Sequence, residues 1–518
     1  MWLDELHTSW CLADGLAEVA PRARAGNQSP LFFWLLFAVD RTLGWLGQVP
    51  PEWRLRIISL ASLAAIVAIA TRVATCMATQ RHAIGGRGLP VAAAAVAVWL
   101  LLDRVILFYA TEARVYALVQ LVSLLGWLAV WRVPIAARYA LLWCGAANAL
   151  AFLHATALLA VAWQIVFGTL LVVSTAPPRR QQRWHWLAAV GLAVGSSLLA
   201  MALSADVWAH RSQWQSFAGQ AGWRDVLELL PLAAYAVPVA LARGLDWLLS
   251  SRRQLPPLAT NSPGVAGAAN QNWLSFRRLW LWATCGPWIT AWALTAGGIA
   301  PVFHRRFVIV SAVPLILLAA GEVGRIQRRW LQWSCLAAVV VWLLVSQGTL
   351  SQVTWDNWRA GYWLGGQRWE GWRPAVEELN RRVQSGDEVW CASGLLEARA
   401  AELPLETQQN EYLSFPLRGA YRVFDPSGQW VAPQALLVQP RDWARQLVEA
   451  APPAGAMAPE RRVWIVYRGT AAGCQRQLAT LQTELGRLSG PGRWTFDRPQ
   501  AFGHVHVIRG VRRSPKAT

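Results

Sequence analysis

Long apolar runs recur along the chain and constrain its fold more than any other feature. A helix rises about 1.5 Å per residue, so about 20 mostly apolar residues are needed to cross a hydrocarbon core. Ten stretches approach this length, at residues 55–75, 89–108, 115–131, 138–153, 155–173, 185–204, 227–249, 279–297, 307–321 and 330–349. The sequence therefore predicts a polytopic α-helical membrane protein.

The composition agrees with a membrane protein and argues against a nucleic-acid partner. Hydrophobic residues make up 55% of the 518 residues and charged residues 15%, whereas soluble domains carry about 25% charged residues. The formal net charge is +19, but the arginines form short clusters between the apolar runs instead of one basic face. The 34 tryptophans suit the headgroup belts of a membrane. We therefore expect contacts with membrane lipid and none with nucleic acid.

The arginine clusters also predict the orientation of the chain, because positive residues are retained on the cytoplasmic side of a membrane. The clusters occupy every second loop between the runs: Arg72, Arg81 and Arg87; Arg132 and Arg138; Arg179, Arg180 and Arg183; Arg252, Arg253, Arg277 and Arg278; and Arg325, Arg328 and Arg329. The other loops, the N-terminal segment and the tail are then extracytoplasmic. This pattern predicts a multi-pass protein of the cytoplasmic (inner) membrane.

Three regions follow from the distribution of the runs. Residues 1–54 form an external segment, in which "SPLFFWLLFAVDRTLGWL" is interrupted by Asp40 and Arg41 and predicts a helix lying in the membrane interface. Residues 55–350 form the membrane domain. Residues 351–518 open with an aromatic juxtamembrane stretch and then alternate helical and β-like runs, such as "PAVEELNRRVQ" and "RRVWIVY". The tail is therefore predicted to be a small extracytoplasmic α/β domain.

Ionisable side chains gather on the predicted outer face. A phosphate leaving group needs cations to hold its charge, and arginine supplies one in a fixed bidentate geometry. An acceptor hydroxyl needs a carboxylate to take its proton. The outer face offers both kinds of group: Asp4 and Glu5, Glu112 and Arg114 in "YATEARVYA", His154, and Arg305 and Arg306 in "FHRRF".

Each of these groups also has a structural explanation, which the sequence leaves open. Charged residues at helix ends and at membrane boundaries often serve the fold instead of a reaction. The alternatives are a helix-dipole effect for Asp4 and Glu5, an internal ion pair for Glu112 and Arg114, headgroup anchors for Arg305 and Arg306, and a satisfied core histidine for His154.

The order of several motifs along the chain resembles one known family. The motifs are "LDELHTSW", "SPLFFWLLF", "RLRIISLASLAAI", "ILFYATEARVYALVQLVSLLGWLAVWR", "FLHATALLAVAWQIV" and "HRRFVIVSAVPLILL". Together they are similar to the GT-C glycosyltransferases of the protein mannosyltransferase and ArnT-like superfamily, closest to its bacterial RgtA-like branch. The resemblance covers roughly residues 2–350, and "YATEARVYAL" is its most specific element.

The resemblance implies roles for the charged residues of the outer face. Members of this family use polyprenyl-phosphate sugars and carry an acidic pair in the first external loop. By resemblance Asp4 is the catalytic acidic residue with Glu5 beside it. The donor-binding residues that it implies are Arg114 and Arg306 on the phosphate, Glu112 in support, and Arg305, His154 and Tyr109 in the substrate site.

Three departures from the family pattern accompany this resemblance. The family has a first span before the acidic pair, and none precedes Asp4 here. We therefore expect an in-frame apolar segment upstream in the gene, since Asp4 would otherwise lie near a fraying chain end. The family's usual run of a small residue, a polar residue and glutamate reads "ATEAR" here, with Thr111 as a minor change. Ala155 stands where an aromatic residue often follows the histidine, which weakens the role implied for His154.

The expected function is an inverting glycosyltransferase that uses a polyprenyl-phosphate sugar on the outer face of the membrane. The acceptor would be an envelope lipid, glycan or protein. Asp4 would deprotonate the acceptor or hold a divalent cation, Mg²⁺ or Mn²⁺, although no cofactor is implied with certainty. Two other functions stay open. One is a transporter or flippase for a lipid-linked glycan, which predicts repeats and broken helices; the other is a non-catalytic envelope protein.

Overall fold

A computed structural model describes most of the chain as two compact units. It describes residues 3–26, 28–45, 49, 51–82, 89–174, 180–205, 222, 224–228, 231–251, 263–346, 370–395, 408–436, 440–449, 461–490 and 493–512. The predicted aromatic stretch at 355–369 lies outside these residues. One unit, here the terminal unit, comprises Met1–Gln28, Phe33–Leu55 and Gly366–Thr518; the other, the helical unit, comprises Ser29–Phe32 and Arg56–Gly365. The terminal unit thus combines the two ends of the chain, which the predicted division at residues 54 and 350 keeps apart.

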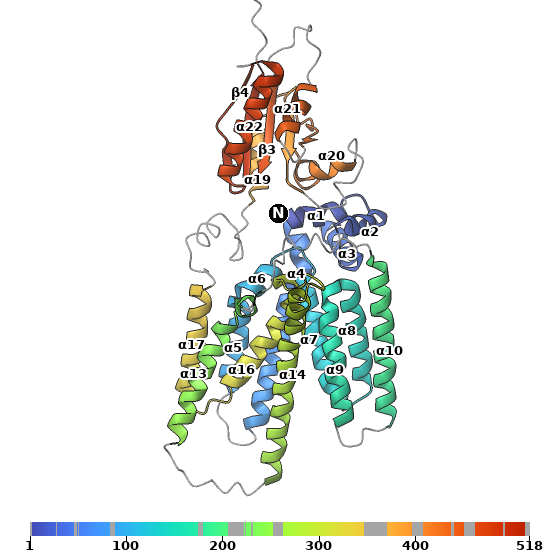
Figure 1. Cartoon of the computed structure of the whole chain (residues 1–518), viewed down its shortest axis with the longest axis vertical. Helices are drawn as coiled ribbons and strands as arrows, with labels where there is room; N and C mark the ends of the chain where they lie inside the picture. Colours follow the sequence, from blue (N-terminus) through green and yellow to red (C-terminus); the bar gives the residue numbers. More distant parts are fainter. Residues whose placement is uncertain are drawn as a thin grey trace, which may run out of the picture. The chain divides into compact units, whose positions relative to one another are not determined.

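The helical unit consists of apolar helices, and all ten predicted stretches overlap them (Figure 1). The elements are α4 (Pro51–His82), α5 (Leu89–Leu102), α6 (Arg104–Ala110), α7 (Tyr116–Arg132), α8 (Arg138–Leu153), η1 (Ala155–Ala157), α9 (Leu158–Ser174), α10 (Arg180–Leu203), α12 (Asp225–Glu228), α13 (Leu232–Ser251), α14 (Pro263–Ala296), α15 (Arg305–Val308), η3 (Ile309–Ser311), α16 (Ala312–Val323) and α17 (Arg329–Ser346). The first turn of α4 belongs to the terminal unit.

Six helical segments among the described residues are long and apolar enough to cross a membrane, which confirms the helical membrane class. They are Pro51–Cys76, Ala155–Ser174, Gln181–Leu203, Leu232–Ser250, Arg305–Val323 and Arg329–Ser346. A seventh arises if α5 and α6, bent by 61° at their junction, form one broken span. The predicted number of ten spans remains a prediction.

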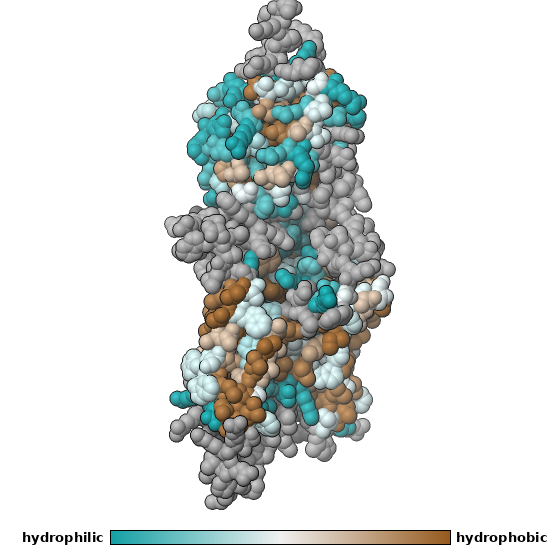
Figure 2. Space-filling model, turned by 60° about the vertical axis from the view of Figure 1, so that its left-hand side comes forward, coloured by the Kyte–Doolittle hydropathy of each residue, from teal (hydrophilic) through white to brown (hydrophobic). Residues whose placement is uncertain are grey.

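The outer surface of the helical unit is apolar, as lipid contact requires. Leu241, Val173 and Val345 are 68%, 70% and 67% exposed. Figure 2 shows hydrophobic residues over a large part of this unit's visible surface. Side chains of this kind would be costly to leave in water over such an area, whereas a hydrocarbon environment accommodates them.

One buried polar side chain inside the helical unit is satisfied by hydrogen bonds between helices. Gln164 of α9 is fully buried. Its carbonyl oxygen accepts a hydrogen bond from Nε1 of Trp143 in α8 at 3.0 Å, and its amide donates to the backbone oxygen of Ser123 in α7 at 3.2 Å. Because lipid offers no hydrogen-bonding partner, such internal bonds join the three helices.

The terminal unit contains the N-terminal helices and a mixed β-sheet with its own helices (Figure 1). Its helices are α1 (Leu3–Leu12), α2 (Leu16–Ala25), most of α3 (Pro30–Trp45), α19 (Trp372–Arg382), α20 (Gln408–Leu413), the π-helical turn η5 (Pro416–Ala420), α21 (Pro440–Glu449) and α22 (Ala471–Ser489). Its strands are β1 (Glu388–Ala392), β2 (Gln434–Ala435), β3 (Arg461–Arg468), β4 (Trp494–Phe496), β5 (Gln500–Phe502) and β6 (Val505–Arg512).

The sheet has the order β2-β1-β3-β6-β4, with β5 also pairing with β6. Strands β1, β2 and β3 run parallel, and β6 runs antiparallel to β3, β4 and β5. One face packs Ile465 and Ile508 against Leu481 and Leu485 of α22 and Trp443 of α21. This apolar layer is the core of the sheet region.

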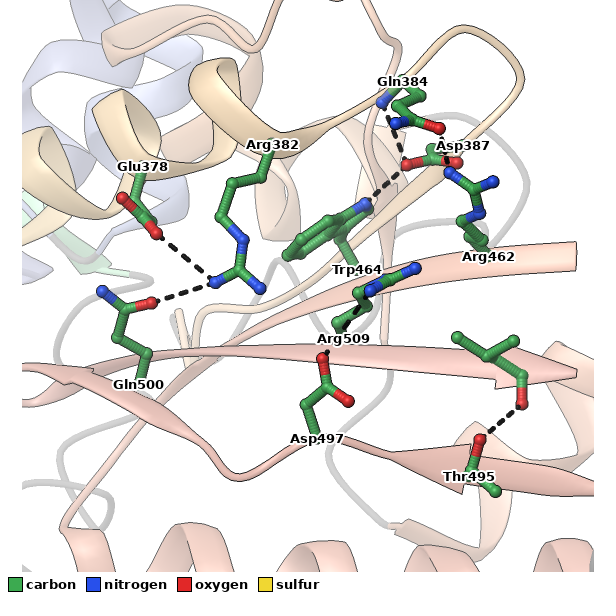
Figure 3. Close-up of polar contacts among 11 residues, drawn as sticks. Glu378, Arg382, Gln384, Asp387, Arg462, Trp464, Thr495, Asp497, Gln500 and Arg509 are labelled. Atoms are coloured by element: carbon green, nitrogen blue, oxygen red, sulfur yellow. Dashed lines mark hydrogen bonds and ion pairs between the residues drawn. The ribbon is translucent and has the colours of Figure 1, made fainter.

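The opposite face of β3 is covered by polar contacts around Trp464 (Figure 3). The guanidinium carbon of Arg382 in α19 lies 5.1 Å from the ring centre of Trp464. Arg382 also donates to Glu378 at 3.3 Å and to Gln500 at 3.2 Å, and Trp464 Nε1 donates to Asp387 at 2.8 Å. These contacts hold α19 and β5 against the centre of the sheet.

Two polar groups join the N-terminal segment to the C-terminal part of the terminal unit. Glu52, in the first turn of α4, accepts hydrogen bonds from Arg373 at 2.6 and 2.7 Å and from the hydroxyl of Tyr421 at 2.9 Å. His7 of α1 lies 3.2 Å from the hydroxyl of Tyr412 through Nδ1. The N-terminal helix therefore has tertiary support, and Asp4 lies on a packed helix although the sequence alone suggested a fraying end.

Candidate functional site

The acidic pair lies in the first turn of α1. Glu5 is 1% exposed, whereas Asp4 is partly exposed. The hydroxyl of Thr8 donates to the backbone oxygen of Asp4 at 3.0 Å, which is a bond within the helix. A carboxylate that only improves a helix dipole gains nothing from burial, which carries a desolvation cost. The helix-dipole explanation therefore accounts for Asp4 but not for the burial of Glu5.

Glu5 belongs to a small group of interacting residues in the terminal unit. Burial raises the pKa of Tyr421 far above its ordinary value, and the negative charges of Glu52 and then Glu5 add to this effect. Glu5 is thus close enough to Tyr421 to act on it electrostatically. The acidic pair consequently stands on a helix held by side chains of the C-terminal region, and a rigid support of this kind fixes the geometry of a functional group.

A second group of predicted site residues meets in the helical unit around His154. His154 follows α8 and precedes η1. Tyr116 at the start of α7 lies 5.6 Å from its ring, and Phe307 of α15 lies 5.7 Å from it, measured between ring centres. Tyr109 at the end of α6 lies 4.9 Å from Tyr116. Aromatic side chains from three parts of the sequence, residues 109–116, residue 154 and residue 307, therefore pack in one cluster.

His154 forms a capping contact with Thr156 in its own turn. Its Nδ1 accepts a hydrogen bond from the backbone N–H of Thr156 at 3.3 Å and lies 2.8 Å from the hydroxyl of Thr156. Burial, followed by the positive charges of Arg306 and Arg114, lowers the pKa of His154 to about 3. The capping bond agrees with the interpretation of His154 as a structural histidine. The two arginines that were predicted to bind phosphate, Arg114 and Arg306, also act on its ring.

Arg114 and Arg306, which act electrostatically on His154, lie in two separate elements. Arg114 is 5% exposed, and its backbone oxygen accepts a hydrogen bond from the buried hydroxyl of Ser59 in α4 at 3.0 Å. Glu112 is buried in the same turn, at 4% exposure. Arg306 lies in the first turn of α15, with its guanidinium carbon 4.8 Å from the ring centre of Phe307. Arg114 in the turn before α7 and Arg306 at the start of α15 thus both act electrostatically on His154.

Arg305 acts on a different group from Arg306. Arg305 influences Asp103 and Arg104 electrostatically. Asp103 stands at the break between α5 and α6, where one carboxylate oxygen accepts the backbone N–H groups of Val105 and Ile106 at 2.9 and 3.1 Å. The other oxygen accepts the hydroxyl of Tyr235 at 2.7 Å. Of the two adjacent arginines in α15, Arg305 thus acts on Asp103 at the break between α5 and α6, and Arg306 acts on His154.

Sequence reasoning missed several members of this cluster. His304 caps α15 just as His154 caps η1, since its Nδ1 accepts the backbone N–H of Arg306 at 3.3 Å. The ring of Phe307 contacts both histidines, at 5.7 Å from His154 and 5.8 Å from His304. The pattern "FHRRF" contained His304, but its likeness to "FLHAT" becomes visible only through the two capping bonds. Tyr116 lies in the motif "YATEARVYAL" but was given no role, and Asp103 and Tyr235 carried no signal beyond their polarity in apolar surroundings.

The structure brings Tyr109, Arg114, His154 and Arg306 together, with Arg305 alongside through Asp103. Buried arginines can bind an anion, because guanidinium groups hold phosphate oxygens in bidentate geometry. Within the described part of the chain, no three His, Cys, Asp or Glu side chains come together as a metal site. Asp4 therefore does not belong to a group of three such side chains among these residues.

Comparisons with known protein families, with characterised proteins and with solved structures give no match for this chain.

Proposed function

We propose that the chain is an inverting membrane glycosyltransferase that uses a polyprenyl-phosphate sugar on the outer face of the cytoplasmic membrane. The observation that carries this proposal is that His154 packs against Phe307, over whose ring Arg306 lies, while the positive charges of Arg306 and Arg114 both lower the pKa of His154. Arg114 is 5% exposed, and a guanidinium group in a poorly solvated region can bind phosphate oxygens through charge-assisted hydrogen bonds. Perturbed groups such as His154 concentrate at functional sites.

The side chains suggest a division of roles. Arg114 and Arg306 hold the donor phosphate and take up its charge as the glycosidic bond breaks. Asp4 accepts the proton of the acceptor hydroxyl, whose oxygen attacks the anomeric carbon from the side opposite the phosphate. The new C–O bond forms as the old one breaks, and the bonding electrons leave with the phosphate. The resemblance of "LDELHTSW" and "YATEARVYAL" to the GT-C enzymes supports these assignments, including Glu5 and Glu112 as supporting acids.

One structural feature favours a second candidate, a transporter or flippase for a lipid-linked glycan. The pair α5 and α6 is bent by 61° around the buried carboxylate of Asp103. Discontinuous helices with buried charges line the substrate sites of many transporters. A transporter would move labelled lipid-linked glycan across a proteoliposome membrane without changing its chemistry. A transferase would instead release polyprenyl phosphate.

The direct test is a donor panel. Purified full-length protein is incubated with labelled polyprenyl-phosphate sugars and an envelope extract as acceptor, and label transfer and polyprenyl phosphate release are measured. We expect one donor to be consumed by the wild type and by Glu18→Gln, whose acid lies in the first turn of α2 and is exposed. Donor consumption should be absent in a sample that lacks protein. If no donor in a complete panel is consumed, the transferase proposal fails.

The orientation of the chain can be measured independently of activity. The arginine pattern predicts that an alkaline phosphatase fusion after residue 360 is active, because the tail is extracytoplasmic, and that a fusion at residue 260 is silent. A β-galactosidase fusion at the same two positions should give the opposite pattern. Activity at residue 260 with silence at residue 360 would place Asp4 and Arg306 on the cytoplasmic side and contradict the proposed location.

A further inference from the structure

An open cavity of about 780 Å³ lies within the terminal unit and is lined by both chain ends. Residues of α1, α2, α3 and the first turn of α4 form one side, and residues from α20 to Trp430 form the other. The size is in the range of pockets that bind small ligands, which is about 300 to 1,000 Å³. The cavity contains none of the site residues predicted from the sequence.

The charges that line the cavity favour an anion. Five arginines and three acids line it: Arg22, Arg41, Arg54, Arg418 and Arg422 against Asp14, Asp40 and Glu411, which leaves a formal charge of +2 (five minus three). Arg22 pairs with Asp14, Arg54 with Asp40 at 3.3 Å, and Arg418 with Glu411 at 3.7 Å.

Two of these arginines are left over after the pairing. Arg422 forms no ion pair with another described residue, and Arg41 rests on the ring of Phe37 with its guanidinium carbon at 4.9 Å. Both side chains are exposed. Two guanidinium groups without a carboxylate partner on the described chain can thus engage phosphate or carboxylate oxygens of a ligand.

The aromatic residues of the cavity add a second requirement. Trp10, Phe415 and Trp430 line it, and Trp430 is 42% exposed. Arg22 lies over the ring of Trp10 at 4.7 Å and Arg418 over that of Trp430 at 5.8 Å. A flat apolar ring beside donors and acceptors suits a ligand with an apolar face and a hydroxylated edge. A sugar ring has this character, whereas a bare inorganic anion does not need the aromatic surface.

The cavity is separate from the proposed catalytic acid. At 3.6 residues per turn, Ser9 and Trp10 project about 120° to 140° away from Asp4 around the axis of α1. Ser9 and Trp10 line the cavity, and Asp4 does not. The cavity therefore opens on another side of the helix, so that its ligand need not be the group that reacts at Asp4.

We propose that this cavity binds an anionic saccharide, a sugar unit that carries a phosphate or a carboxylate. Arg422 and Arg41 bind the negative group, Trp430 packs on the ring, and the paired carboxylates accept hydrogen bonds from ring hydroxyls. This binding does not depend on whether the chain transfers a sugar.

Binding to the full-length protein in nanodiscs of neutral lipid tests this site. The probes are a trimer of galacturonic acid and glucose 6-phosphate as the two sources of negative charge, with maltotriose as the neutral control. We expect saturable binding of at least one anionic probe and at least tenfold weaker binding of maltotriose. Arg422→Ala should weaken binding of the anionic probe about tenfold or more, because a charge-assisted bond is lost, and Trp430→Ala should weaken it several-fold.

Control variants separate this proposal from the transferase and from general charge effects. Arg476→Ala removes an exposed arginine of α22 away from the cavity and should leave affinity within about twofold. Asp4→Asn should bind the probe as the wild type does, so binding and transfer can fail separately. Equal binding by Arg422→Ala, Trp430→Ala and the wild type, with all proteins folded, overturns the proposal. Binding of phosphatidylglycerol nanodiscs through Arg422 without any saccharide binding would assign the cavity to a lipid headgroup and also overturn it.

Discussion

Asp4→Asn is expected to insert normally, to retain donor binding and to lose at least a hundredfold in sugar transfer. A general base contributes about a hundredfold to ten-thousandfold in rate. An acid that only favours a helix dipole contributes about 0.3 to 1 kcal/mol of stability. Asparagine keeps the size and polarity of the side chain and removes its basicity. The expected losses under the two explanations therefore differ by orders of magnitude in a labelled transfer assay.

Two further variants make the Asp4 result specific. Glu18→Gln changes an exposed acid in the first turn of α2 and should transfer at the wild-type rate. Glu5→Gln should reduce transfer less than Asp4→Asn does, because Glu5 is buried and is assigned a supporting role. If Asp4→Asn transfers sugar at a rate within a few-fold of the wild type, the acidic pair has a purely structural role.

The sequence alone predicted much of the local structure. The length of the apolar runs was enough to predict helices, because ten runs near the length of a membrane span overlap helices of the structure. The β-branched and aromatic residues of "RRVWIVY" were enough to predict a strand there, and this run lies in β3. These signals are local, since each depends on residues that are adjacent in the chain.

The tertiary arrangement had no comparable signal. Arg114 and Arg306 both act electrostatically on His154, and their spacing in the sequence does not predict this. The arrangement depends on how α7, η1 and α15 pack. The break of 61° between α5 and α6 is likewise unmarked by proline or glycine at the junction, where Asp103 caps α6. The hydrogen bonds that Glu52 accepts from Arg373 and Tyr421, more than 300 residues away, likewise had no signal in the sequence. Long-range pairings of polar groups carry no sequence period, so only the folded structure reveals them.

Arg306→Ala is expected to reduce donor use about tenfold or more while leaving the fold intact. A charge-assisted hydrogen bond to a phosphate that is partly removed from water contributes about 1.5 to 3 kcal/mol, and 1.4 kcal/mol corresponds to a tenfold change. Arg306→Lys should recover only part of this loss, because an ammonium group cannot form the bidentate contact of a guanidinium. The loss in Arg306→Ala and the partial recovery in Arg306→Lys are measured by comparing how the transfer rate depends on donor concentration in each variant and in the wild type.

A structural anchor would respond differently from a phosphate ligand. If Arg306 only anchored the start of α15 among lipid headgroups, lysine would replace it fully and alanine would change stability instead of donor use. Arg138→Ala is the matched control, since Arg138 is an exposed arginine at the start of α8 that lies over the ring of Tyr139 at 5.2 Å. Arg138→Ala should use donor as the wild type does. Arg306→Ala protein that is folded and turns over donor at the wild-type rate would remove Arg306 from the phosphate site, and Arg114 would then stand as its only arginine beside His154.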